Sequence, residues 1–229
     1  MGKETEQKQE IVNQGVHTYS QEEAYVWPEE PVLREQLEWF QDQKLALMVH
    51  WGVYNQLGMV ASWALSDEDA EWSRKTVDWT DDGELFKRQY RALNRAFDPV
   101  AFQPEEWAKM AKKCGFRYLI LTTKHHDGFC LWDTAYTEYK TTAEDCPFHT
   151  HKYADIVRAM FDAFRKEKLG IGVYYSKADW HCPDYWEKEK VFTGKTTRNP
   201  TYDPKENPEA WERFRAFTRD QILELGKQY

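Results

Sequence analysis

Histidines follow short apolar runs at two points of this sequence, where their ring nitrogens could bind a polar ligand. His50 closes one run, and the adjacent His125 and His126 close another. A neutral imidazole has one donor and one acceptor nitrogen, so several of them lining one pocket suit a ligand rich in hydroxyl groups. A lone histidine is more often a hydrogen-bonded structural residue, so the inference depends on the fold bringing the three together.

Aromatic residues at two further places extend this set. Tyr174 and Tyr175 end a third apolar run. Successive strand residues point to opposite faces, so one tyrosine should face the ligand and the other the surrounding helices. Alternation alone does not say which. Trp63 lies in the segment after His50, where its indole could donate a hydrogen bond, stack on a ligand, or simply fill the core.

A metal site at these histidines is not favoured. His125 and His126 would share one ion only if the strand has already broken there, because neighbouring strand residues point apart. No carboxylate stands beside His50, and open zinc sites usually take three or more protein ligands with supporting hydrogen bonds. We therefore expect no metal, and a metal-dependent hydrolase, which a chelator would inactivate, is a third alternative.

The elements that must position these residues alternate along the chain. Apolar runs typical of strands occupy residues 45–49, 116–123 and 169–175. Helical spacing is found at about 31–44, 104–114, 153–168 and 208–226. This alternation predicts the α/β class, with a parallel sheet and right-handed crossovers. Residues 53–98 lack a long apolar period, so we expect an elaborated loop with short helices there.

The composition argues against several classes of partner and site. The 229 residues carry a net charge of −8, and an acidic surface repels phosphate backbones, so nucleic acid is an unexpected partner. No apolar stretch is long enough to cross a membrane, and the first residues are too polar for a signal peptide. We expect a soluble chain, whose compartment stays open because a leader could have been removed. The four cysteines form no CxxC pair, and we expect free thiols, with a disulfide as the alternative.

Three segments together resemble the opening of the α-L-fucosidases of glycoside hydrolase family twenty-nine. They are WFQDQKLALMVHWG at 39–52, the stretch containing TTKHHDGF at 97–132, and KLGIGVYYSKADW at 168–180. Their order and separations are similar to those in the family, and TTKHHDGF is highly specific. The resemblance covers roughly residues 37–180.

The resemblance implies a (β/α) barrel of the TIM type, of which residues 31–229 would hold about the first three β-α units after a polar lead-in at 1–30. It implies an exo-acting enzyme that removes terminal α-L-fucose from glycoconjugates with retention, through an attacking Asp and a second carboxylic acid. It implies no cofactor. The matched positions that would bind fucose are His50, Trp63, His125, His126 and Tyr174. Trp63 matches less securely, because the family more often shows Glu-Trp where this chain has Ser62-Trp63.

The chain departs from the family pattern at the catalytic carboxylates. In the family the nucleophilic Asp ends a fourth strand, and none of the later aspartates follows an apolar run here: Asp179, Asp184, Asp203 and Asp220. We therefore expect the nucleophile and the general acid beyond Tyr229, and the alternative is a non-catalytic fucose-binding or interaction protein. Three parallel strands would also leave two unpaired sheet edges, which favour association with another chain.

Overall fold

The computed structural model describes residues 27–75 and 77–229, so most of the predicted lead-in at 1–30 lies outside the described residues. The chain separates into two compact units, Met1–Asp42 and Gln43–Tyr229. Helix α2 (Pro31–Gln43) lies almost wholly in the first unit and occupies the predicted segment. The Glu30 carboxylate accepts from the N–H groups of Val32 and Leu33, which satisfies two of the free donors at the start of this helix.

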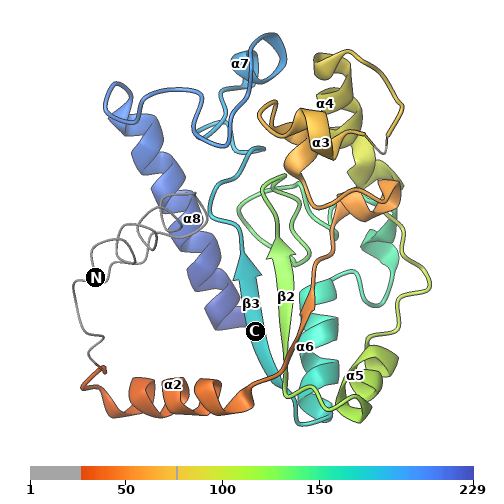
Figure 1. Cartoon of the computed structure of the whole chain (residues 1–229), viewed down its shortest axis with the longest axis vertical. Coiled ribbons are helices and arrows are strands. Elements are labelled where there is room, and N and C mark those ends of the chain that lie inside the picture. Colours follow the sequence, from red (N-terminus) through yellow and green to blue (C-terminus); the bar gives the residue numbers. More distant parts are fainter. Residues whose placement is uncertain (1–26, 76) are drawn as a thin grey trace, which may run out of the picture. The chain divides into compact units, whose positions relative to one another are not determined.

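The second unit is built on a parallel sheet of three strands in the order β1-β2-β3 (Figure 1). The strands are β1 (Ala46–Val49), β2 (Tyr118–Lys124) and β3 (Gly170–Tyr175). Tyr118 pairs with Ala46 on one side and with Gly170 on the other. The predicted α/β class and parallel pairing are therefore confirmed.

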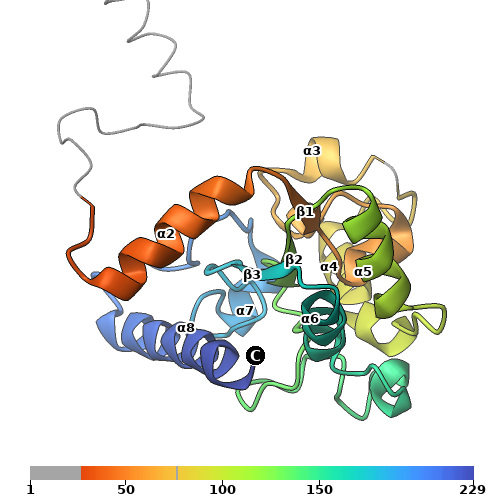
Figure 2. The ribbon, with the colours of Figure 1, turned by 90° about the horizontal axis from the view of Figure 1, so that it is seen from below.

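Three long helices follow the predicted segments and begin with the expected signals. They are α5 (Pro104–Lys113), α6 (Ile156–Lys166) and α8 (Pro208–Gln228). Proline opens both α5 and α8, where its missing N–H leaves no bond unmade. The side chains of Asp155 and Asn207 accept from backbone N–H groups at the starts of α6 and α8. Figures 1 and 2 show α5 beside α6 near β2, and α8 beside β3.

The segment between β1 and α5 is the elaborated connection that the sequence predicts. Its short helices are η1 (Val53–Leu57), η2 (Trp63–Leu65), α3 (Ala70–Ser73), α4 (Gly83–Arg91) and η3 (Ala92–Ala96). Two more short helices, η4 (Pro147–Thr150) and α7 (Lys188–Thr193), lie in the later loops. These loops place Trp63 and other residues near the ends of the strands.

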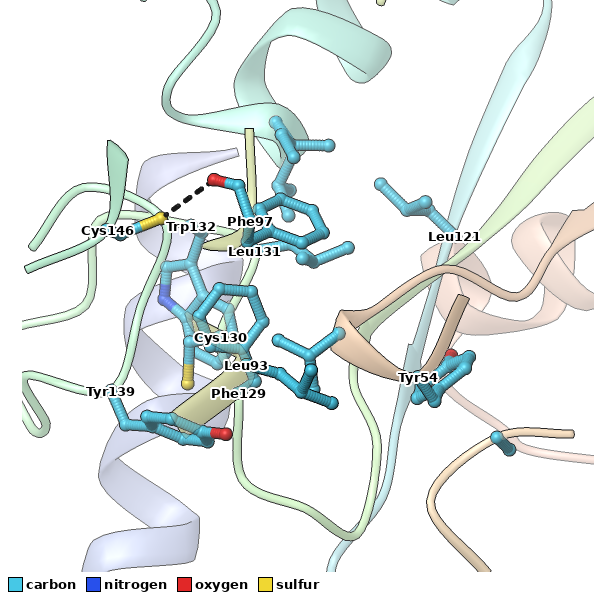
Figure 3. Packing of buried hydrophobic residues seen from close by; sticks show 14 of the residues in the cluster. Tyr54, Leu93, Phe97, Leu121, Phe129, Cys130, Leu131, Trp132, Tyr139 and Cys146 are labelled. Atoms are coloured by element: carbon cyan, nitrogen blue, oxygen red, sulfur yellow. Dashed lines mark hydrogen bonds between the residues drawn. The ribbon is translucent and has the colours of Figure 1, made fainter. Parts of the chain in front are cut away.

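Aromatic side chains fill much of the core of the second unit. Figure 3 shows Phe97 and Phe129 within a packed group that also contains Trp132 and Tyr139. The thiol of Cys146 donates to the carbonyl oxygen of Phe97 at 3.5 Å, and all four cysteines are free, as predicted. Among the described residues, no helix is both long and apolar enough to cross a membrane.

The outer strands are less covered than the central one. The unbroken apolar run of β1 is typical of a strand covered on both faces, but no residue of β1 is fully buried. In β3 the Val173 side chain is 45% exposed, whereas Leu119 and Leu121 of β2 are fully buried. The apolar runs therefore identify strands correctly but do not distinguish the centre of a sheet from its edges.

Candidate active site

The carboxyl ends of the three strands bring two histidines and a tyrosine together. The rings of His50 and His125 have centroids 5.3 Å apart. The Tyr174 ring lies 5.3 Å from that of His50 and is stacked over His125 at 6.3 Å. Parallel strands end at the same edge of a sheet, which is why residues so far apart in sequence meet there.

Trp63 and His126 complete one continuous aromatic group, called here the histidine cluster: His50, Trp63, His125, His126 and Tyr174. The Trp63 ring lies 5.2 Å from His126 and 5.7 Å from His125. Trp63 is half-buried, as a residue facing both a core and an opening would be. The structure thus joins all five residues that the sequence singled out, and their role in binding a sugar stays a prediction.

The structure shows which of the two tyrosines at the end of β3 faces the histidines. Tyr174 contacts the histidines, whereas the Tyr175 hydroxyl donates to the side-chain oxygen of Gln221 on α8 at 2.7 Å. The side chain of Lys124 also contacts Tyr175, with its Nζ atom 3.0 Å from the hydroxyl. The two neighbours therefore face opposite sides, as alternation requires.

His125 is the most buried of the three histidines. Its Nδ1 atom accepts from the Ser62 backbone N–H at 3.4 Å and lies 2.5 Å from the Ser62 hydroxyl oxygen. Burial, reinforced by the neighbouring His126 and His50, lowers the pKa of His125 to about 2. The ring is therefore neutral at physiological pH and can take part only as a neutral hydrogen-bonding group.

His126 is held by the loop that follows β3. Its Nδ1 atom lies 2.9 Å from the Ala178 carbonyl oxygen, and its own carbonyl accepts from the Trp180 N–H at 2.7 Å. The Trp180 ring stacks on the imidazole at 4.8 Å. Burial lowers the pKa of His126 as well, so this ring is also neutral.

Behind the cluster lies a buried ion pair that sequence reasoning missed. Lys124 Nζ is 2.7 Å from an oxygen of Asp179 and donates to the Gln221 side chain at 3.0 Å. The other oxygen of Asp179 accepts from the N–H groups of His181 and Cys182. Burial alone would lower the pKa of Lys124, but the Asp179 charge outweighs it and the pKa is raised. The pair joins the end of β2 to the loop that carries Ala178.

The turn after His126 is shaped by the same aspartate. Gly128 has φ of +80°, and a Cβ atom there would lie 2.5 Å from an oxygen of Asp179. Asp127 is buried, and its two oxygens accept from the Tyr90 hydroxyl at 2.9 Å and the Phe129 N–H at 3.1 Å. Burial raises the pKa of Asp127 to about 7. Asp127 and Gly128 of the HHDG sequence thus stabilise the turn that follows His126.

Signals for some of these missed residues were present in the sequence. Lys124 is a charged residue at the end of an apolar run, which is rare in a buried strand unless the charge has a partner. Asp179 and Ser62 carried no such signal, because their partners come from distant elements. Across residues 27–75 and 77–229, no group of three or more His, Cys, Asp or Glu residues is arranged to hold a metal ion.

Comparison with known proteins agrees with this geometry. The sequence pattern of one family, described as alpha-L-fucosidase, matches residues 12–229. The tissue alpha-L-fucosidase of Rattus norvegicus is 29% identical over 82% of this chain and 39% of its own length. The chain thus spans about two fifths of that relative.

Solved structures give the same relationship. An α-L-fucosidase of Bacteroides thetaiotaomicron, trapped as a covalent intermediate, superposes with a TM-score of 0.59 at 28% identity, covering 90% of this chain and 41% of that one. An α-L-fucosidase of Lactobacillus casei in complex with α-L-fucose gives 0.53 at 31% identity, covering 76% and 51%. With the family pattern matched over nearly the whole sequence, this chain belongs to the α-L-fucosidase family.

Proposed function

We propose that this chain is the sugar-recognising part of an exo-acting α-L-fucosidase, which hydrolyses terminal α-L-fucose from glycoconjugates with retention. The histidine cluster would bind the fucose. The observation that carries the proposal is the convergence of His50, His125 and Tyr174 from three strand ends, with ring centroids 5.3 to 6.3 Å apart.

The chemistry of the cluster suits a neutral sugar. Neutral imidazoles, a phenol and an indole offer donors and acceptors for hydroxyl groups without a formal charge. The aromatic faces of Trp63 and Tyr174 offer apolar surface for the carbon side of a sugar ring. The pKa values of His50, His125 and His126 are all lowered, so the three rings are uncharged. They therefore favour an uncharged ligand over a sugar acid, whose carboxylate binds better to a cation.

The catalytic carboxyl groups are proposed to lie beyond Tyr229. Retaining hydrolysis takes one carboxylate as nucleophile and one carboxylic acid as proton donor. The two buried aspartates nearest the cluster in sequence do not fit either role, because both oxygens of Asp127 and of Asp179 already accept hydrogen bonds from neighbours. The covalent intermediate named for the Bacteroides relative supports the retaining assignment.

We also propose that residues 31–229 form the first portion of a (β/α)-barrel catalytic domain. The strand order β1-β2-β3 with parallel pairing is the order in which a barrel is built up. An apolar groove of about 530 Å³ lies beside β3 and α8, with Ile171, Val173 and Ile222 among its lining residues. Another strand pairing with β3 would cover this groove, which supports association through the unpaired edge.

The engagement of Asp127 and Asp179 also favours a second candidate, a non-catalytic fucose-binding protein. Hydrolysis of a chromogenic α-L-fucoside separates the two when it is measured on the protein with the residues that follow Tyr229, where the catalytic carboxyl groups are proposed to lie. For the enzyme, we expect turnover that falls at least tenfold in His126→Ala and is unchanged in His149→Ala, an exposed histidine outside the cluster. Fucose binding without turnover would favour the binding protein. Absence of both activities would contradict the proposal.

A further inference from the structure

The two adjacent histidines of the cluster each use Nδ1 to contact a backbone group, and the two backbone groups have opposite roles. At His125 the partner is the Ser62 N–H. At His126 the partner is the Ala178 carbonyl oxygen. A backbone N–H can only donate and a carbonyl oxygen can only accept, so each contact fixes which ring nitrogen holds the proton.

For His125, an approaching N–H requires a lone pair on Nδ1. The proton of the neutral ring must then sit on Nε2. The Ser62 hydroxyl, 2.5 Å from the same Nδ1 atom, can donate a second hydrogen bond to it. Ser62 is fully buried, so neither of its groups has water as a competing partner.

For His126, the carbonyl of Ala178 requires a proton on Nδ1. The lone pair of the neutral ring is then on Nε2. The carbonyl is fixed in place because Trp180, two residues later, returns a backbone hydrogen bond to the His126 carbonyl and stacks on the imidazole. The Lys124–Asp179 pair ties the same loop to the end of β2.

The Nε2 atoms of both rings are left for a ligand. Neither has a hydrogen-bond partner among the described residues, and neither is a buried polar atom without a partner, so both reach the surface. The two rings lie at 73° with centroids 4.7 Å apart. One sugar is large enough to contact both.

We propose that His125 and His126 are held in opposite tautomers, so that the cluster presents one N–H donor and one nitrogen acceptor to two hydroxyl groups of a single sugar. The sugar part of this inference rests on the proposed function. A hydroxyl accepting from His125 and another donating to His126 satisfy both rings. A methyl ether in place of the second hydroxyl cannot donate, so the site would reject it.

The backbone N–H of Ser62 is the group that sets the tautomer of His125. Ser62 is therefore a positioning residue, which acts on the ligand through the tautomer of His125.

Nitrogen-15 NMR of the labelled 229-residue chain at pH 7 tests the tautomers directly, because protonated and unprotonated ring nitrogens resonate far apart. Single His→Gln variants assign the signals. We expect His125 protonated on Nε2 and His126 on Nδ1. Ser62→Ala, which keeps the backbone N–H, should leave the His125 proton on Nε2.

The same tautomer on both wild-type rings would overturn the inference, and so would a His125 proton that moves to Nδ1 in a folded Ser62→Ala variant. If that variant fails to fold, the wild-type spectrum still decides. Adding L-fucose in the same experiment separates this inference from the proposed function. Opposite tautomers with no response to fucose would uphold the tautomers and count against fucose binding.

Discussion

Strand β3 borders two different regions. In one of them the polar groups have partners within the chain, and in the other apolar side chains are left exposed. At its carboxyl end, Tyr174 contacts the histidines, and Tyr175 contacts a polar network in which the buried charges of Lys124 and Asp179 are paired. Along its outer flank, Val173 and the Ile222 side chain of α8 are each 45% exposed beside an apolar groove. The residues of the histidine cluster are thus held by contacts inside the chain, whereas the flank leaves apolar side chains exposed.

Removal of the Lys124 charge should have the largest effect. In Lys124→Met the Asp179 carboxylate would remain buried without its ion-pair partner, which costs about 3–5 kcal/mol in the free energy of unfolding. Urea denaturation measures the loss. Lys109→Met is the matched control, because Lys109 pairs with Glu106 on an exposed helix face, where solvent screens the charges and such a pair contributes little to stability. Equal losses in the two variants would show that the buried pair is not what holds this end of β3.

A methyl group at Gly128 should have the next largest effect. In Gly128→Ala the new carbon would meet Asp179 and His181, and the residue would keep a φ of +80° that alanine rarely adopts. We expect a loss of about 1–3 kcal/mol in thermal or urea unfolding. Gly226→Ala, at a helix position with open space around the new carbon, should instead be neutral or stabilise by about 0.5–1 kcal/mol. Equal effects at the two glycines would contradict the tight packing of the turn.

The buried carboxyl group of Asp127 should make the free energy of unfolding fall as pH rises. Burial raises its pKa from 3.8 to about 7, so the folded chain keeps a proton that the unfolded chain loses near pH 4. The resulting stability is fully present below about pH 4 and is lost as pH rises through about 7. Urea unfolding between pH 5 and pH 8 should therefore show a smaller decline in Asp127→Asn than in the wild type. Parallel pH profiles would mean that this carboxyl is ionised in the folded state.

The apolar flank should respond by changing association, with little change in stability. Val173→Lys places a charge on the exposed face of β3, where it should oppose strand pairing and shift the chain toward monomer in sedimentation velocity. We expect less than about 1 kcal/mol change in unfolding free energy, because the side chain is half-exposed. Val100→Lys is the control, since Val100 is 68% exposed in a loop away from the sheet. The same shift in both variants would rule out the β3 edge as the contact.

The sequence predicted the strands, the helices and the members of the histidine cluster better than it predicted the residues that contact the cluster. Strands and helices follow from local periodicity, which is why the runs ending in His50, His125 and Tyr174 were recognised. The choice between Tyr174 and Tyr175 depended on which face of β3 meets the histidines, and alternation alone does not contain that information. Ser62 and Asp179 matter through partners 63 and 55 residues away in sequence, and no local pattern reports such pairs.

Binding of L-fucose, followed by isothermal titration calorimetry, tests the central claim most directly. We predict saturable binding of L-fucose, at least tenfold weaker binding in His126→Ala, unchanged binding in His149→Ala, and no binding of the mirror-image sugar D-fucose. Equal affinity for the two sugars, or full affinity in His126→Ala, would contradict the account of the histidine cluster as a fucose site.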